Sequence, residues 1–253
     1  SFHFSLYRKN RFENENYIQF VNQFKPDIIH SHLYYADLLI HSYFYPHAIY
    51  FSHQHNSVVK EYEGIQWKNF FKKSTWTNYY QFIWLKKRYR KFKTSFIACS
   101  AGTETMLKKK VGTGKIFTLP NSISLPSLPY TNKTITNDVL QIIWVGRLSD
   151  AKRPQMAIEI AKCLRDRNVA FHLKMVGVGI HLENCNALIQ KHQLESNVQM
   201  TGLIHEMNEV YRNADLMIHT ALYEGLPMVF AEANSYGIPI ISSDCMPHNE
   251  ILV

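Results

Sequence analysis

The 253-residue sequence predicts an α/β protein built from parallel, doubly wound sheets. Short apolar runs alternate with stretches of helical pattern along the chain, and this alternation is typical of parallel sheets with helices on both faces. Residues 124–137 are rich in Pro, Ser, Thr and Asn, which is the composition of a linker. We therefore expect two domains, residues 1–134 including the linker and residues 135–253.

The elements of the first half follow from these apolar runs. Helices are expected at residues 15–24, 34–43 and 101–110, and strands at residues 27–32, 48–52, 95–100 and 115–119. Four histidines, His30, His32, His53 and His55, fall within or directly after the first two strands. Such a group of histidines could indicate a metal site. No acidic ligand stands near them in the sequence, which argues against a metal.

Residues 67–93 have an unusual composition. They contain nine Lys or Arg and ten aromatic residues but no acid. A basic, aromatic helix suits a membrane interface, where aromatic rings enter the headgroup layer and cations meet anionic lipid. A long helix with its aromatics in the core is the structural alternative. Nucleic acid could use the same chemistry but is the least favoured partner.

Charge and composition narrow the class of protein. Residues 1–134 hold 19 Lys and Arg against 7 Asp and Glu, whereas residues 135–253 hold 9 against 13, so the first half should face an anionic partner. No apolar run reaches the roughly 18 residues of a membrane-spanning helix. The four cysteines lack metal-ligand spacing and are expected to be free thiols in a reducing cytoplasm.

The second half is organised around residues 221–244. Strands are expected at residues 140–145, 171–176, 198–201, 214–221 and 238–243, and helices at residues 154–167, 181–192, 206–213 and 228–236. Gly225 allows a ligand to approach the backbone, and the free N–H groups of a helix beginning at Met228 suit a phosphate. Glu224 and Glu232 flank this place, and carboxylates pair well with sugar or ribose hydroxyls. The alternative is a helix-start acid and a solvated helix residue.

These residues carry a resemblance to a known family. The Glu-x7-Glu spacing in EGLPMVFAE, followed by ANSYGIPIISSD, resembles the donor-site signature of the retaining glycosyltransferases of family 4. The resemblance implies a GT-B fold: an acceptor-side Rossmann-like domain and a nucleotide-sugar-binding Rossmann-like domain that face each other across a cleft. It also implies that both domains are truncated here, since the family's first domain opens with a further strand and glycine-rich loop and its second domain continues in a helix.

The same resemblance implies an activity. A hexosyltransferase of this kind moves a sugar, with retention at the anomeric carbon, from a nucleotide-diphosphate sugar such as a UDP-sugar to a hydroxyl of a glycan or lipid-linked glycan. The expected setting is capsule or exopolysaccharide biosynthesis on the inner face of the cell membrane. Neither a metal nor another cofactor is expected. A sugar-nucleotide epimerase of similar fold and a catalytically inactive sugar-nucleotide-binding module are the alternatives.

The resemblance also assigns roles to residues. Arg147 and Lys152 match the family's diphosphate-binding cations, although two solvated surface cations are the alternative. Glu224 is expected to contact the donor hexose and Glu232 the ribose, while His53, with His55 as second choice, lies on the acceptor side. The predicted catalytic set is Glu224, His53, Arg147 and Lys152, and the other predicted donor-binding residues are Gly177, Gly179, Gly225, Leu226, Pro227 and Met228.

Overall fold

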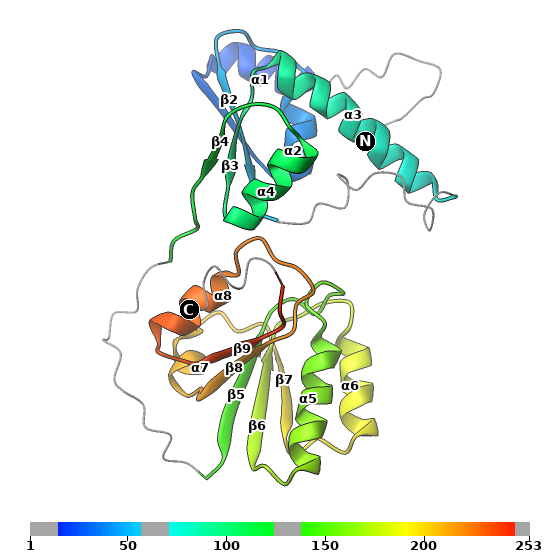
Figure 1. Cartoon of the computed structure of the whole chain (residues 1–253), viewed down its shortest axis with the longest axis vertical. Coiled ribbons are helices and arrows are strands. Elements are labelled where there is room, and N and C mark those ends of the chain that lie inside the picture. Colours follow the sequence, from blue (N-terminus) through cyan, green and yellow to red (C-terminus); the bar gives the residue numbers. More distant parts are fainter. Residues whose placement is uncertain (1–14, 57–70, 124–137, 246–253) are drawn as a thin grey trace. The chain divides into compact units, whose positions relative to one another are not determined.

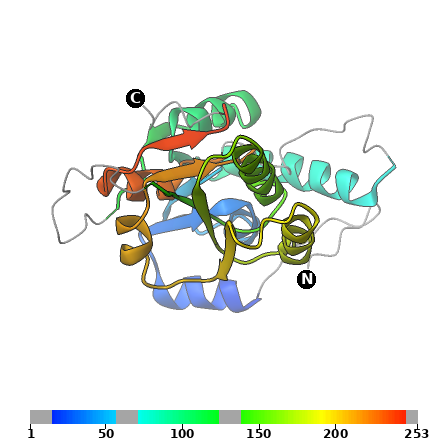
Figure 2. The ribbon, with the colours of Figure 1, turned by 90° about the horizontal axis from the view of Figure 1, so that it is seen from below.

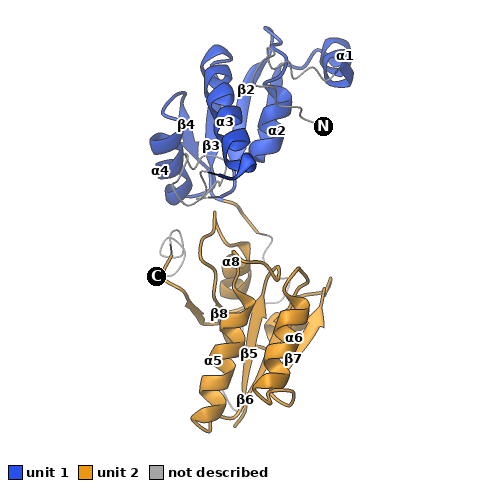
Figure 3. Cartoon of the chain, turned by 90° about the vertical axis from the view of Figure 1, so that its right-hand side faces the viewer, with its two compact units in different colours: residues 1–120 blue, residues 121–253 orange. Residues whose placement is uncertain are grey.

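The computed structural model describes residues 15–56, 71–123 and 138–245. The chain divides into two compact units, Ser1–Pro120 and Asn121–Val253 (Figure 3). The predicted linker, residues 124–137, lies outside the described residues. Within the described parts of both units every strand pairing is parallel, as the alternation of strands and helices predicts.

The N-terminal unit contains a four-stranded sheet with its strands in chain order (Figure 1). The strands are β1 (Ile28–His32), β2 (Ile49–Gln54), β3 (Ser95–Ala98) and β4 (Ile116–Thr118), and the helices are α1 (Glu15–Phe24), α2 (Leu33–Ile40), α3 (Lys73–Lys91) and α4 (Ala101–Lys110). Leu38, Leu85 and Leu107 bring α2, α3 and α4 together with Phe96 of the sheet in one apolar cluster. A second cluster joins α1 through Val21 to the first two strands.

A buried carboxylate joins three elements of this unit to α2. Asp37 of α2 accepts hydrogen bonds from the hydroxyl of Ser31, and from Ser52 Oγ at 2.7 Å. It also accepts from Gln54 Nε2 and Tyr89 Oη, each at 2.8 Å. Burial raises the pKa of Asp37 to about 6, and the four donors oppose that rise. Asp37 therefore ties α2 to β1, β2 and α3 at an electrostatic cost.

The C-terminal unit is a five-stranded sheet in the order β7-β6-β5-β8-β9. The strands are β5 (Leu140–Val145), β6 (Phe171–Val176), β7 (Val198–Gly202), β8 (Leu216–His219) and β9 (Ile240–Ser242), and the helices are α5 (Pro154–Asp166), α6 (Leu182–Lys191), α7 (Asn208–Arg212) and α8 (Met228–Ser235). Ile142 packs in the cluster with α5 and α6, and its neighbour Ile143 packs in the cluster with α7 and α8. The sheet is therefore covered on both faces (Figure 2), which makes it doubly wound.

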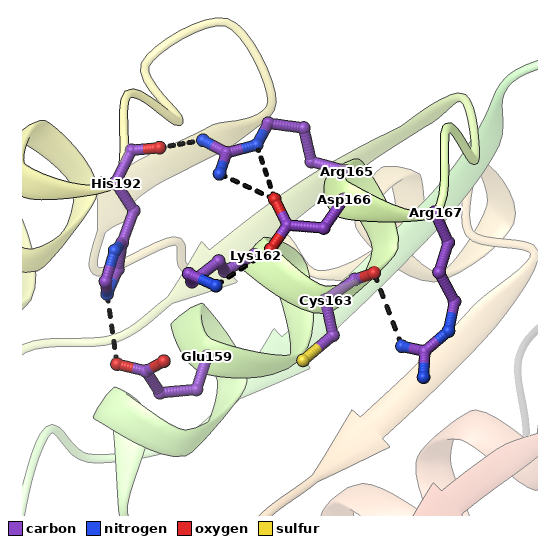
Figure 4. A network of polar contacts seen from close by, with 7 residues as sticks. All are labelled: Glu159, Lys162, Cys163, Arg165, Asp166, Arg167 and His192. Carbon is purple, nitrogen blue, oxygen red and sulfur yellow. Dashed lines mark hydrogen bonds and ion pairs between the residues drawn. The ribbon is translucent and has the colours of Figure 1, made fainter.

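A surface network holds the end of α5 against the end of α6 (Figure 4). Arg165 donates to the carbonyl oxygen of His192, and His192 Nε2 lies 3.1 Å from Glu159 Oε1. Asp166 accepts from Lys162 and Arg165, each at 2.8 Å, and these bonds lower the pKa of Asp166 to about 2. Exposed ion pairs of this kind add little stability. The two contacts with His192 are the ones that join α5 to the end of α6.

The Asp37 carboxyl predicts a pH dependence of stability. The pKa of Asp37 in the folded state, about 6, lies above its ordinary value of 3.8. As the pH falls, Asp37 therefore takes up a proton at a higher pH in the folded state than in the unfolded state. The contribution of Asp37 to stability is therefore complete below its ordinary pKa and is lost as the pH rises through about 6. Relative to Asp37→Asn, the free energy of unfolding of the wild type should rise by about 1 kcal/mol between pH 7 and pH 5.

Urea unfolding of the whole chain at several pH values measures this difference. Other titrating groups, including buried His41, are common to both proteins and cancel in the comparison. Asp27→Asn, at an exposed aspartate just before β1, is the matched control and should change the free energy of unfolding by no more than about 0.5 kcal/mol. A wild-type-to-Asp37→Asn difference that stays constant with pH would contradict the prediction.

Candidate functional site

The strand order of the C-terminal unit creates a switch point between β5 and β8. The chain proceeds from β5 to β6 and β7 on one side and then returns to β8 on the other side. In open α/β sheets, ligands bind outside the carboxyl ends of the strands at such a point. The loops that follow β5 and β8 meet here, since the Leu222 amide donates to the Ala151 carbonyl at 2.8 Å.

Thr220, directly after β8, fixes the loop that follows β5. Its buried hydroxyl accepts a hydrogen bond from Trp144 Nε1 at 3.0 Å. The same oxygen lies 2.8 Å from the carbonyl oxygen of Lys152 and 2.9 Å from that of Arg153. Arg153 has a left-handed backbone (φ 48°), and Pro154 then begins α5. Thr220 therefore holds the tight turn that carries Lys152.

The Glu224 carboxylate lies at the centre of this region. Lys152 Nζ donates to Glu224 Oε1, and His219 Nε2 lies 3.1 Å from the same oxygen. The Glu224 side chain is 13% exposed and that of His219 is 2% exposed. A largely buried carboxylate needs such partners, because an unpaired buried charge is costly. The structure therefore brings together two predicted site residues, Glu224 and Lys152, with His219, which the sequence pattern did not single out.

Helix α8 begins shortly after Glu224. Pro227 has an extended backbone and precedes the first helical residue, Met228. Glu232, one turn into α8, accepts a hydrogen bond from the hydroxyl of Tyr211 on α7. Burial and the Glu232 carboxylate raise the pKa of Tyr211, whose ring also stacks on Tyr236 with centroids 5.3 Å apart. Glu232 is thus held by α7 and is not a freely solvated helix residue.

Gly177 and Gly179, after β6, allow two loop backbones to touch. Gly177 has φ +144°, and a Cβ there would lie 1.8 Å from the carbonyl oxygen of Gly146. A Cβ on Gly179 would lie 2.4 Å from the carbonyl oxygen of Leu148. Protein backbone therefore occupies the space that these glycines leave, and the result is to shape the loop that bears exposed Arg147. Direct contacts of Gly177, Gly179 and Arg147 with a donor stay predictions.

The four histidines that the sequence pattern singled out, His30, His32, His53 and His55, lie together at one end of the N-terminal sheet. His32 of β1 is paired in register with His53 of β2. The rings of His30 and His53 stack with centroids 5.6 Å apart, and those of His53 and His55 with centroids 4.1 Å apart. Burial and the neighbouring histidines lower the pKa of His53 to about 4. The structure therefore gathers four imidazoles at the carboxyl ends of β1 and β2. The acceptor-side role of His53 and His55 stays a prediction.

The basic aromatic segment is partly helical and partly buried. Helix α3 covers Lys73–Lys91, and residues 67–70 lie outside the described residues. Phe82 and Tyr89 are buried in the core, whereas Trp76 and Trp84 are half-buried. The N-terminal part of α3 extends beyond the sheet of its own unit (Figure 1). Among the described helices, none combines the length and apolarity that crossing a bilayer requires.

Comparison with known proteins assigns the region around Glu224. Residues 131–253 match the family model described as "Glycosyl transferases group 1". This stretch is nearly half of the chain, and it is similar to the family over the C-terminal unit. This match includes the β5–β8 switch point and α8 but does not reach the histidines of the N-terminal unit.

Curated relatives match over part of their length. The amylovoran biosynthesis glycosyltransferase AmsD of Erwinia amylovora is 31% identical over 105 residues, which is 42% of this chain and 29% of AmsD. The lipopolysaccharide 1,6-galactosyltransferase of Salmonella typhimurium is 31% identical over 108 residues, 41% of this chain and 30% of that enzyme. Across the curated relatives, the matched part spans between 28% and 50% of their length.

Solved structures show the fold. TarM of S. aureus is 18% identical with a TM-score of 0.74, covering 93% of this chain and 46% of TarM. HepE of Anabaena, solved with UDP and glucose, is 15% identical with a TM-score of 0.73, covering 94% of this chain and 64% of HepE. At these identities the likeness concerns the fold alone, and it confirms the predicted GT-B-like class with Rossmann-like parallel sheets.

Proposed function

We propose that the chain is part of a glycosyltransferase that moves a sugar from a nucleotide-diphosphate sugar to a hydroxyl of a glycan or lipid-linked glycan in surface polysaccharide biosynthesis. The observation that carries this proposal is the Lys152–Glu224 pair beside the start of α8, within the residues that match the glycosyl transferases group 1 model. The names of AmsD and the lipopolysaccharide galactosyltransferase support the setting. The UDP in the HepE structure supports a UDP-sugar as donor.

In this proposal the donor lies along the carboxyl edge of the sheet. The Lys152 ammonium and the Arg147 guanidinium neutralise the diphosphate, and the free N–H groups at the start of α8 add partial positive charge. Glu232, held by Tyr211, accepts hydrogen bonds from the ribose hydroxyls. When the bond between sugar and diphosphate breaks, these cations stabilise the charge on the leaving diphosphate. Transfer then requires no metal ion.

The sugar end of the donor meets Glu224. Lys152 and His219 orient its carboxylate, so it can accept hydrogen bonds from the donor hexose in one fixed geometry. On the acceptor side, the neutral His53 ring can accept a hydrogen bond from the acceptor hydroxyl. The stereochemical outcome that we propose is retention at the anomeric carbon, with no covalent protein nucleophile.

We also propose that α3 places the protein on the cytoplasmic face of the membrane. Lys87, Arg90 and Lys91 are exposed, and Trp76 and Trp84 are only half-buried, so cations and aromatic rings are both available at the surface. Anionic lipid attracts such cations at about 1 kcal/mol each. The rings of Phe82 and Tyr89 are buried in the core and are not available for membrane contact.

Liposome co-sedimentation tests this membrane contact. Replacing Lys87, Arg90 and Lys91 together with Gln should weaken binding to anionic vesicles by about 100-fold, given about 1 kcal/mol for each cation. The matched control replaces Lys162, Arg165 and Arg167, which are cations of α5 and its end in the other unit. Equal binding of the wild-type chain to neutral and anionic vesicles would contradict the proposal.

If Lys152 contacts the diphosphate, its removal should lower the affinity for the nucleotide. Lys152→Ala should weaken the binding of free UDP by about 10- to 150-fold, because a charge-assisted hydrogen bond contributes about 1.5–3 kcal/mol. Lys162→Ala, at a lysine of α5 paired with Asp166, is the control and should leave UDP affinity unchanged. Titration calorimetry with UDP measures both. Unchanged affinity in Lys152→Ala would remove this residue from the donor site.

The two glutamates should separate by role. Glu232→Gln should weaken the binding of UDP and of the UDP-sugar alike, because the ribose belongs to both ligands. Glu224→Gln should spare UDP and lower turnover, since an interaction made with the reacting sugar affects kcat. A 100-fold loss in kcat would correspond to about 2.7 kcal/mol of transition-state stabilisation.

The donor for the turnover measurement is found by incubating the protein with a panel of sugar nucleotides and measuring the UDP released. The affinity of each variant for UDP is then measured by calorimetry, independently of turnover. If Glu224→Gln lost UDP binding while Glu232→Gln kept it, the donor would lie in the opposite direction along the sheet edge. If both substitutions changed the free energy of UDP binding and the activation free energy by no more than about 0.5 kcal/mol, both glutamates would be surface residues without a role in the site.

A further inference from the structure

The imidazole cluster of the N-terminal unit has a chemistry that the proposed transfer does not use. His30 and His32 are two residues apart on β1, so their side chains share one face of the sheet. His53 on the adjacent strand β2 lies beside His32 on that face. The ring nitrogens that His30, His32 and His53 can each offer lie within 4.8 Å of one another. Three nitrogen ligands from two adjacent strands are therefore close enough to converge on one ion.

His53 is the member of the cluster that points to a ligand. It is 8% exposed, and neither of its ring nitrogens has a hydrogen-bond partner among the described residues. A buried polar ring without partners is costly, and native structures rarely keep one without a reason. The rings around it come from the other three histidines, with centroid separations of 4.1–5.6 Å.

We infer that His30, His32 and His53 form a binding site for a d-block divalent cation such as Zn²⁺. Neutral imidazoles are the preferred ligands of such ions, and three of them leave a coordination position open for water or a substrate oxygen. His55 lies next to this set, with Nε2 2.8 Å from His32 Nδ1, and can hold the His32 ring in place. No carboxylate belongs to the set within the described residues, which favours these ions over Mg²⁺ or Ca²⁺.

The electrostatics of the cluster agree with this assignment. Burial and neighbouring histidines lower the pKa values of His30, His53 and His55 from their ordinary range. These histidines belong to the N-terminal unit, and they share no residue with the Lys152–Glu224 donor site, which needs no metal in our proposal. A cation bound here would occupy the lone pair of His53 that is otherwise available to an acceptor hydroxyl.

Metal binding to the whole chain tests the inference directly. The chain is stripped with EDTA and dialysed against ZnCl₂, and bound zinc is counted per chain. We expect one tightly bound Zn²⁺, with affinity lowered at least about tenfold in His30→Gln and in His53→Gln. His47→Gln, at an exposed histidine before β2, and Cys163→Ser, at an exposed thiol, are the controls and should bind as the wild type does.

Co²⁺ supplies a second readout of the ligands. Replacement of Zn²⁺ by Co²⁺ should give the intense visible absorption of a four- or five-coordinate ion, without the near-ultraviolet band of a thiolate ligand. Circular dichroism reports whether each variant is folded. Because His30 is exposed, His30→Gln should still fold, and it tests the site even if His53→Gln unfolds. Zinc binding that is absent, that is unchanged in folded His30→Gln, or that is lost in Cys163→Ser would overturn the inference. Since no step of this experiment involves UDP or turnover, its failure and a failure of the proposed function can be told apart.

Discussion

The pairing of the Glu224 carboxylate with the Lys152 ammonium determines the shape of the carboxyl edge of the C-terminal sheet. Lys152 follows β5 and Glu224 follows β8, so one ion pair joins the loops on the two sides of the switch point. His219 contacts the same carboxylate oxygen.

Much of this arrangement could be predicted from the sequence, because it depends on residues at strand ends. The apolar runs locate β5 and β8, and residues that follow parallel strands must meet at one edge of the sheet. The order of residues along the chain is therefore enough to place Glu224 and Lys152 at the same edge. It does not place His219 there, since a histidine in the apolar run ADLMIHTA is equally compatible with a core position. Its role depends on the tertiary position of Glu224.

Contacts between distant elements were the part that local patterns could not predict. Tyr211 holds Glu232 across 21 residues, and nothing in the short α7 indicates that its tyrosine faces α8. The close approach of the Gly146 backbone to Gly177 was likewise beyond local patterns, and the predicted donor contact of Gly177 stays a prediction. Asp37 likewise gains its four donors only when β1, β2 and α3 assemble around α2.

The two units use opposite electrostatic solutions at the same structural position, the carboxyl ends of adjacent parallel strands. In the C-terminal unit a lysine and a histidine contact a buried carboxylate. In the N-terminal unit four histidines lie together, and burial and neighbouring histidines lower the pKa values of His30, His53 and His55. A charged site suits a diphosphate, whereas a neutral imidazole cluster suits a hydroxyl or a metal cation.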